Sequence, residues 1–285
     1  MEQHPIFPAI HLHSDSELAE ALGASIVERE TIRQWPLSCV QRLVLNGGEK
    51  LVYKSQLPPT VETRFFERAC SAILPSHRFL GKLGRCDTMT IEWIDAPLLR
   101  DTAVSAPDIV EHGKRILLQI SQIQGDLPIY LDIGTVPAWL SEVSSTLEKL
   151  SALIQKRWFR SSTSAEVQRV HEWAESIEIR DAIAHQPGLI HGDLKADQIF
   201  VTPDGYRLID WQRPAIAPPE VDLVSLLVGQ AIDPNLYVEP VFVKIFWFLR
   251  LHWAVQAQAD LFPESRNRLF DQWSSEAIQK ILSKS

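Results

Sequence analysis

The sequence predicts an α+β fold, with a small N-terminal β-sheet lobe that contains one important helix and a larger, mostly helical C-terminal lobe. Roughly the first ninety residues hold short β-favouring runs separated by turn residues. From Asp95 onward, apolar residues instead recur at the three- and four-residue spacing of helices. The 285 residues, 45% of them hydrophobic, suffice for two lobes. We therefore expect two domains, residues 1–94 and 95–285.

The N-terminal strands are predicted at 26–35, 37–46, 50–54, 78–83 and 88–94, each rich in β-branched or aromatic residues. The turn at Asn46-Gly47-Gly48 is a strong hairpin signal, because Asn and Gly tolerate positive φ. Between the third and fourth strands, apolar residues at helical spacing predict a helix within residues 58–74.

Three helices of the C-terminal lobe have recognisable N-terminal residues. Ser105, Thr135 and Thr163 each precede an apolar pattern of helical period, and Thr163 with Glu166 fits a capping box. Residues 241–255 are the most apolar stretch, but they fall short of the ~20 apolar residues of a membrane span. We expect a buried helix there and no membrane segment. Two short strands, 198–201 and 206–209, are predicted around the turn residues Pro203-Asp204-Gly205.

Composition and charge argue against some classes of function. A formal net charge of −8 argues against nucleic-acid binding, which needs clustered Lys and Arg. Three cysteines without framework spacing make structural disulfides an unlikely feature of this chain. The N-terminal residues lack a basic start followed by an apolar stretch, so a cytoplasmic location is expected.

The segment from His191 to Trp211 carries the chemistry. Asp193 lies in a loop just before a predicted strand, Gln198 follows five residues later, and Asp210 ends the next strand. A tight hairpin can bring Gln198 and Asp210 to one Mg²⁺ and leave Asp193 to face a substrate hydroxyl. Phosphoryl transfer needs these parts, since a metal neutralises phosphate charge and a carboxylate accepts the hydroxyl proton.

These motifs resemble those of the aminoglycoside phosphotransferase and small-molecule kinase family. The run from His191 to Gln198 looks like the catalytic loop of that family, and Leu208-Ile209-Asp210-Trp211-Gln212 looks like its metal-binding strand. Asp222 resembles the aspartate at the start of the family's following helix. The resemblance implies a protein-kinase-like two-lobed fold and transfer of the γ-phosphoryl group of ATP, with Mg²⁺, to a hydroxyl of a small molecule.

The resemblance also implies roles for individual residues. Asp193 would be the catalytic base, and Lys195 would contact the transferred phosphoryl group. Asp210 and Gln198 would be the metal ligands. In the small lobe, Lys54 resembles the strand lysine that holds the α- and β-phosphates, with Glu62 its preferred acidic partner over Glu67. The segment 91–94 resembles the hinge, in which backbone groups of Glu92 and Ile94 pair with the adenine edge.

Two departures from the family pattern keep a second hypothesis open. The family carries Asn where this chain has Gln198, and the turn around Ser38 lacks the glycines that let backbone amides approach phosphates. The alternative is a catalytically weak or inactive, pseudokinase-like nucleotide-binding module. A protein kinase is disfavoured, because Gly192 replaces the usual Arg and too few residues separate Asp210 from Asp222 for an activation segment.

The acceptor has no readable code in the sequence. The acidic residues of the C-terminal lobe have two possible roles: they line a pocket for a cationic acceptor, or they lie on solvated helix faces. These residues are Glu220, Asp233, Glu239, Asp260 and Glu264. The sequence does not distinguish ATP from GTP as the nucleotide, and it does not indicate the oligomeric state.

Overall fold

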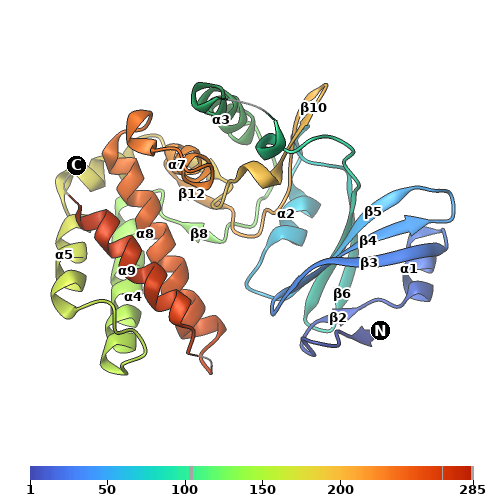
Figure 1. The fold of residues 1–285 in the computed structure, drawn as a ribbon, viewed down its shortest axis with the longest axis horizontal. Coiled ribbons are helices and arrows are strands. Elements are labelled where there is room, and N and C mark those ends of the chain that lie inside the picture. The colour runs from blue at the N-terminus through green and yellow to red at the C-terminus, as the bar shows by residue number, and fades with distance from the viewer. Residues whose placement is uncertain (103–104, 265, 284–285) are drawn as a thin grey trace. The chain divides into compact units, whose positions relative to one another are not determined.

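A computed structural model describes residues 1–102, 105–264 and 266–283, and it confirms the predicted α+β fold class (Figure 1). The chain forms two compact units. The first, here called the sheet unit, comprises Met1–Ala103, Gln122–Tyr130 and Ala196–Pro214, and the second, the helical unit, comprises Val104–Ser121, Leu131–Lys195 and Ala215–Ser285. The chain passes between the units several times, so neither unit is one continuous stretch. A domain boundary after residue 94 remains a prediction.

The sheet unit is built on a five-stranded antiparallel sheet in the order β3-β4-β5-β7-β6. Its strands are β3 (Ile26–Trp35), β4 (Ser38–Leu45), β5 (Lys50–Gln56), β6 (His77–Leu83) and β7 (Cys86–Glu92). The predicted hairpin at Asn46–Gly48 joins β4 to β5, with Gly48 at φ 84°.

The two faces of this sheet carry different partners, because successive side chains of a strand point to opposite faces. Tyr53 packs with Leu43 and with Leu18 of helix α1 (Asp15–Leu22) in one apolar core. Lys54, the next residue along β5, instead contacts helix α2 (Glu62–Arg68). Strand alternation thus places the lysine on the face opposite the α1 core.

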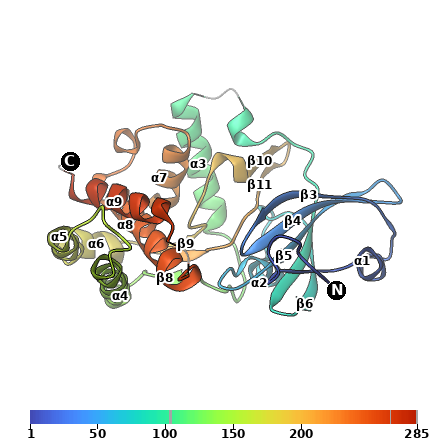
Figure 2. The ribbon, with the colours of Figure 1, turned by 60° about the horizontal axis from the view of Figure 1, so that its bottom comes forward.

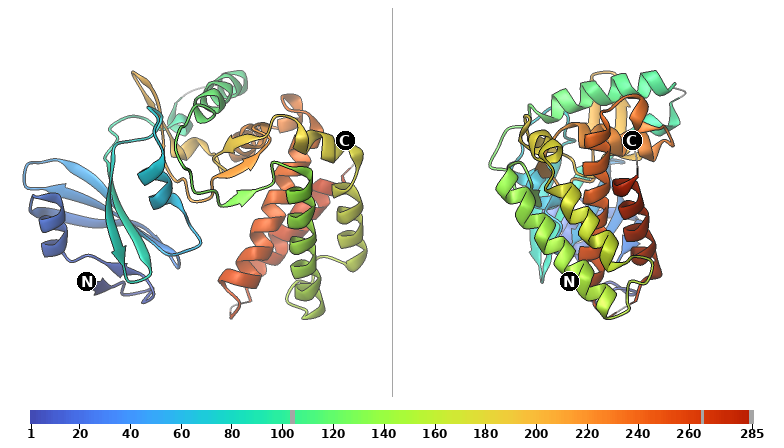
Figure 3. Two further views of the ribbon diagram at one scale, coloured as in Figure 1. Left: turned by 180° about the vertical axis from the view of Figure 1, so that it is seen from behind. Right: turned by 90° about the vertical axis from the view of Figure 1, so that its left-hand side faces the viewer.

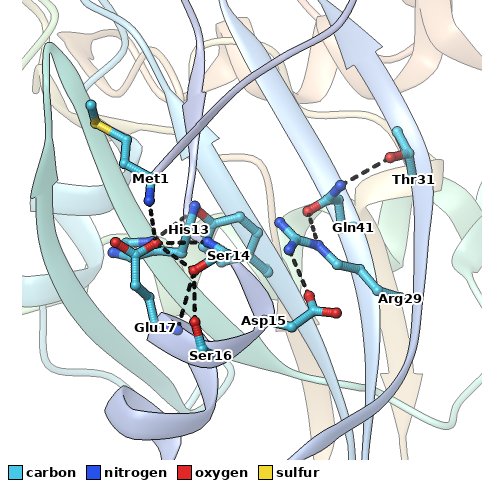
Figure 4. Close-up of polar contacts among 10 residues, drawn as sticks. Met1, His13, Ser14, Asp15, Ser16, Glu17, Arg29, Thr31 and Gln41 are labelled. Atoms are coloured by element: carbon cyan, nitrogen blue, oxygen red, sulfur yellow. Dashed lines mark hydrogen bonds and ion pairs between the residues drawn. The ribbon is translucent and has the colours of Figure 1, made fainter.

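Polar contacts anchor helix α1 to the N-terminal segment and to the sheet, as Figure 4 shows. Ser14 and Glu17 form a capping box at the start of the helix. The ammonium group of Met1 lies 2.7 Å from Glu17, and Arg29 of β3 lies 2.8 Å from Asp15. The short strands β1 (Glu2–Gln3) and β2 (His11–Leu12) pair antiparallel beside this helix.

Helix α2 is shorter than the apolar spacing predicts. It ends at Arg68, although the pattern continues to Ile73. The backbone of Cys70 instead exchanges hydrogen bonds with that of Gln124, at 2.8 and 3.2 Å. A tertiary backbone pairing therefore replaces the last predicted helical turns.

The predicted second hairpin is confirmed as β10 (Ile199–Thr202) and β11 (Gly205–Leu208), which follow a single turn of 3₁₀ helix, η2 (Ala196–Gln198). The hairpin belongs to the sheet unit. Val201 donates its backbone N–H to Pro97, close to the 3₁₀ turn η1 (Leu99–Asp101), and Leu208 donates to Ile73. These bonds fix the strand that leads into Asp210.

The helical unit contains a three-stranded sheet and a group of packed helices. The sheet order is β8-β12-β9, and its strands are β8 (Leu131–Asp132), β9 (Gly188–Ile190) and β12 (Ala215–Ala217). The helices are α3 (Ala106–Ile120), α4 (Val136–Gln155), α5 (Ser164–Ala174), α6 (Ile177–Ala184), α7 (Glu220–Gly229), α8 (Pro240–Gln256) and α9 (Arg268–Leu282), with short turns η3 (Pro234–Leu236) and η4 (Ala257–Leu261). The predicted N-caps Ser105, Thr135 and Thr163 all accept a backbone N–H.

Helix α8 is the centre of this unit. It packs against α4 and α9, which run beside it in Figures 2 and 3. Its buried residues lie on all sides, and Phe248 contacts the indole of Trp139 at 4.6 Å between ring centroids. The prediction of a buried helix over 241–255 is confirmed. Among the described residues, none of the helices is both long and apolar enough to span a membrane.

Candidate active site

The sheet unit contains a buried ion pair between two predicted site residues. The ammonium of Lys54 lies 2.6 Å from Oε1 of Glu62, and the two residues are 5% and 0% exposed. Gln56, two residues along the same face of β5, donates its side-chain amide to the other oxygen of Glu62. Because a buried charge is costly unless it is paired, this geometry holds Lys54 in one position.

A third charge completes the cluster. Oδ1 of Asp210 lies 3.8 Å from the Lys54 ammonium. Burial acts to lower the pKa of Lys54, but the carboxylates of Glu62 and Asp210 outweigh it and raise that pKa. Lys54 therefore stays cationic between these two carboxyl groups. Burial raises the pKa of Glu62, and the charge of Lys54 opposes that rise.

Asp210 is held in an uncommon backbone conformation at the end of the β10-β11 hairpin. Its φ is +73°, in the left-handed region, which Asp tolerates better than most residues. Gln212 donates its backbone N–H to the Asp210 carbonyl at 2.8 Å and its side-chain amide to Oδ1 at 2.7 Å. Trp211 stacks on Phe65 of α2 at 4.4 Å between ring centroids. These contacts direct the carboxylate of Asp210 towards Lys54.

Gln198 lies beside Asp210, as the hairpin spacing predicts. Its Nε2 donates to Oδ2 of Asp210 at 3.2 Å, and its backbone carbonyl accepts from Ile209 at 3.1 Å. Rotation of the amide by half a turn places its oxygen, rather than its nitrogen, beside the carboxylate. The pair then presents two oxygen donors, which suit Mg²⁺ when nucleotide phosphates and water complete the coordination.

This donor set differs from an all-protein metal centre. Among the described residues, no group of three or more His, Cys, Asp or Glu side chains is placed to hold a metal ion. A site of two protein oxygens fits only a cation that arrives with other ligands.

The predicted hinge and phosphate turn are also in the sheet unit. The backbone N–H of Glu92 donates to Ser76 at 2.9 Å, and that of Trp93 donates to Lys50 at 3.3 Å. Pairing with adenine would therefore have to use the carbonyl of Glu92 and the amide of Ile94. The turn between β3 and β4 is tight, and the buried Ser38 hydroxyl accepts the indole N–H of Trp35 at 2.6 Å.

In the helical unit, Asp193 lies in the loop after β9. Gly192, at φ 82°, supplies the left-handed turn that precedes Asp193. Fully buried Asp222 of α7 holds this loop by accepting the backbone N–H groups of His191 at 2.6 Å and Gly192 at 3.0 Å. The helix therefore fixes the backbone next to the predicted base.

The carboxylate of Asp193 pairs with two cations of the helical unit. Nζ of Lys195 lies 2.9 Å from Oδ2, and Nη1 of Arg250 lies 3.5 Å from Oδ1. The sequence pattern does not single out Arg250, although a charge inside an otherwise apolar helix was an available signal. The pattern also assigns no role to Gln56 or Gln212. Their one available signal is that they stand two residues after Lys54 and Asp210.

Burial raises the pKa of Asp222 to about 7, against the opposing effect of the two backbone N–H groups, and the charge of Asp193 adds to the rise. Because the folded pKa exceeds the ordinary 3.8, Asp222 stabilises the fold fully below pH 3.8, and this contribution is lost as the pH rises through about 7. The ionised form is nevertheless the one that accepts both loop amides.

We therefore expect stability and turnover to depend on pH in opposite directions. The contribution of Asp222 to the free energy of unfolding should fall between about pH 4 and 7 and level off above that range, while turnover rises as Asp222 ionises. In Asp222→Asn this component of the stability profile should vanish, and turnover should drop about tenfold, since Asn replaces one acceptor oxygen by a donor. Denaturant unfolding and turnover across this range measure both. Equal pH slopes of stability in the two chains would contradict the role given to Asp222.

The structure thus gathers the predicted residues into two groups. Lys54, Glu62, Asp210 and Gln198 come together in the sheet unit, and Asp193 and Lys195 come together in the helical unit. A cavity of about 390 Å³ between α4 and α5 contains none of these residues.

Comparisons with known proteins identify the family and the fold. Residues 75–242 match the phosphotransferase enzyme family, APH. The comparison with curated proteins gave no match. Among solved structures, the chain is similar to the spectinomycin phosphotransferase APH(9)-Ia, with 16% identity, a TM-score of 0.58, and coverage of 96% of this chain and 99% of that one.

Two further structures are similar to the chain. A macrolide 2'-phosphotransferase, MphH, from Brachybacterium faecium shares 13% identity, with a TM-score of 0.59 and coverage of 94% of this chain and 97% of that one. A choline/ethanolamine kinase family protein from Mesorhizobium loti shares 14%, with a TM-score of 0.61 and coverage of 90% and 88%. These likenesses confirm the protein-kinase-like fold. Because the family match spans more than half of the 285 residues, the chain belongs to the APH phosphotransferase family.

Proposed function

We propose that the chain transfers the γ-phosphoryl group of ATP to a hydroxyl of a small molecule. The observation that carries the proposal is the cluster of Lys54, Glu62 and Asp210, in which a buried, paired cation lies 3.8 Å from the carboxylate of Asp210, a residue with a left-handed backbone conformation. Similar proteins support the choice of ligands. APH(9)-Ia was crystallised with ADP and spectinomycin, and APH(4)-Ia with AMP-PNP and hygromycin B.

In this proposal the sheet unit binds the nucleotide. The Lys54 ammonium holds the α- and β-phosphates, and Glu62 keeps it in place. Backbone groups of Glu92 and Ile94 pair with adenine. Asp210 and Gln198 would hold Mg²⁺, which would supply positive charge to the phosphates and offset the charge of Asp210.

The helical unit supplies the groups that act on the acceptor. Asp193 orients the acceptor hydroxyl and takes its proton while the hydroxyl oxygen bonds to the γ-phosphorus. The bond from that phosphorus to the bridging oxygen of ADP breaks in the same transfer. Lys195, already within 2.9 Å of Asp193, contacts the transferred phosphoryl group. Asp222 keeps the loop backbone in position through its two N–H contacts.

Thermal unfolding with nucleotide tests the binding half of the proposal. With Mg²⁺-ATP at about 100 times its Kd, we expect stabilisation of about 2.7 kcal/mol, seen as a shift of several degrees in Tm. ATP with a chelator should shift Tm less, since Asp210 then repels the phosphates. No shift with Mg²⁺-ATP would contradict the proposal.

Turnover tests the second half and separates the proposal from its alternative. ATP consumption is measured with a panel of aminoglycosides, macrolides, amino alcohols, sugars and hydroxy acids. The alternative, a pseudokinase-like nucleotide-binding module, is favoured by Gln198 and by the glycine-free turn at Ser38. Binding of Mg²⁺-ATP without turnover on any acceptor would favour that module.

A further inference from the structure

A second cation at the proposed base has no part in the reaction described above. Lys195 contacts Oδ2 of Asp193, where it would meet the phosphoryl group, but Arg250 contacts Oδ1 from helix α8. A base must offer one oxygen to the acceptor hydroxyl. Lys195 and Arg250 therefore contact different oxygens of the Asp193 carboxylate.

The contact between Arg250 and Asp193 leaves much of the guanidinium unused. Its 3.5 Å separation between Nη1 and Oδ1 is longer than the ~2.7–2.9 Å of a charge-assisted hydrogen bond. A guanidinium has five N–H donors in a planar fork that matches carboxylate and phosphate groups. The Arg250 side chain is 37% exposed, so a ligand can reach it.

The charges on helix α8 favour an anion over a cation beside Arg250. Helix α8 carries Lys244 and Arg250 but no Asp or Glu. Two of the acidic residues considered for a cationic acceptor are engaged elsewhere. Asp260 pairs with Lys149 at 2.6 Å, and Asp233 caps η3 by accepting the backbone N–H of Asn235. An ammonium group brought to Asp193 would meet the like charge of Arg250.

We propose that Arg250 determines acceptor specificity and that the acceptor carries an anionic group beside its hydroxyl, as hydroxy acids and sugar acids do. The inference rests on the proposed function. On binding, the anion takes the guanidinium, and Arg250 no longer pairs with Oδ1 of Asp193. An anionic acceptor thus releases the base from Arg250 as it binds, whereas a neutral or cationic one leaves the Asp193–Arg250 pair intact.

The charge of the acceptor is measured first. Small molecules from a cell extract are separated by ion exchange into anionic, neutral and cationic fractions, and ATP consumption is measured with each. Glucuronate, glucose and glucosamine serve as a defined set of matched size. Turnover with anions supports the inference. Turnover only with the neutral or cationic fraction overturns it and leaves the kinase activity standing. No turnover with any fraction overturns the proposed transfer, and the inference with it.

Variants of Arg250 give the second measurement. Arg250→Gln should raise KM for the anionic acceptor at least about tenfold and leave KM for ATP unchanged, and Arg250→Lys should recover part of the loss. Lys244→Gln, on the same helix, is the control and should change neither KM. A thermal unfolding curve for each variant verifies folding. An unchanged acceptor KM in folded Arg250→Gln, or a fall in kcat alone, would overturn the role given to Arg250.

Discussion

Replacing Asp193 by Asn is expected to lower kcat for phosphoryl transfer by about 10³-fold. Asn keeps the size of the side chain but cannot accept the hydroxyl proton. It also loses the negative charge that pairs with Lys195 and Arg250, which lie 2.9 and 3.5 Å away. Steady-state ATP consumption with the acceptor measures the loss. Stabilisation by Mg²⁺-ATP should persist, since the proposed nucleotide ligands belong to the sheet unit.

Asp197→Asn is the matched control for this change. Asp197 lies four residues after Asp193, in the 3₁₀ turn η2, and its side chain is 46% exposed and pairs with Arg100 at 3.6 Å. An exposed pair of this kind contributes little, so kcat should change less than about threefold. A kcat for Asp193→Asn that is as high as that of the control would show that Asp193 is not the base.

The largest effect on stability is expected from Lys54→Met. It leaves Glu62 fully buried beside Asp210 without its ammonium partner, and breaking such a pair costs about 3–5 kcal/mol. Turnover at limiting ATP should also fall by about 10²-fold or more, because the phosphates lose a fixed cation. Chemical denaturation and kcat/KM for ATP measure the two effects separately.

The double variant Lys54→Met/Glu62→Gln separates a structural pair from a functional one. Removing both charges should restore most of the stability, since Gln stays neutral and can still bond to Gln56. Activity should stay low. Lys50→Met, an exposed position on the same strand, is the control for both measurements. Recovery of activity together with stability would show that Lys54 serves the fold alone.

The structure contains the predicted pair of Lys54 and Glu62, but the choice of Glu62 over Glu67 rested on the family resemblance. Local patterns predict only the two elements, a β-favouring run that ends at Lys54 and a run of helical spacing that contains Glu62. The same patterns could not predict the end of α2 at Arg68. That end depends on the backbone pairing of Cys70 with Gln124, more than fifty residues away in the chain.

The surroundings of Asp222 and Arg250 also depend on long-range packing. Asp222 acquires its raised pKa from complete burial, which no local pattern reports. Arg250 belongs to an apolar helix whose sequence predicts burial, and the packing of α8 alone decides that its guanidinium reaches Asp193.

Taken alone, the order of residues predicts the α+β fold class, because turn residues, hairpin spacing and helix starts act over fewer than about twenty residues. The phosphotransferase loop is predicted by its resemblance to a known family. Which charges gather around Lys54 and Asp193 is a matter of tertiary structure. Such contacts join residues distant in the chain, and burial, which controls their strength, exists only once the core has formed.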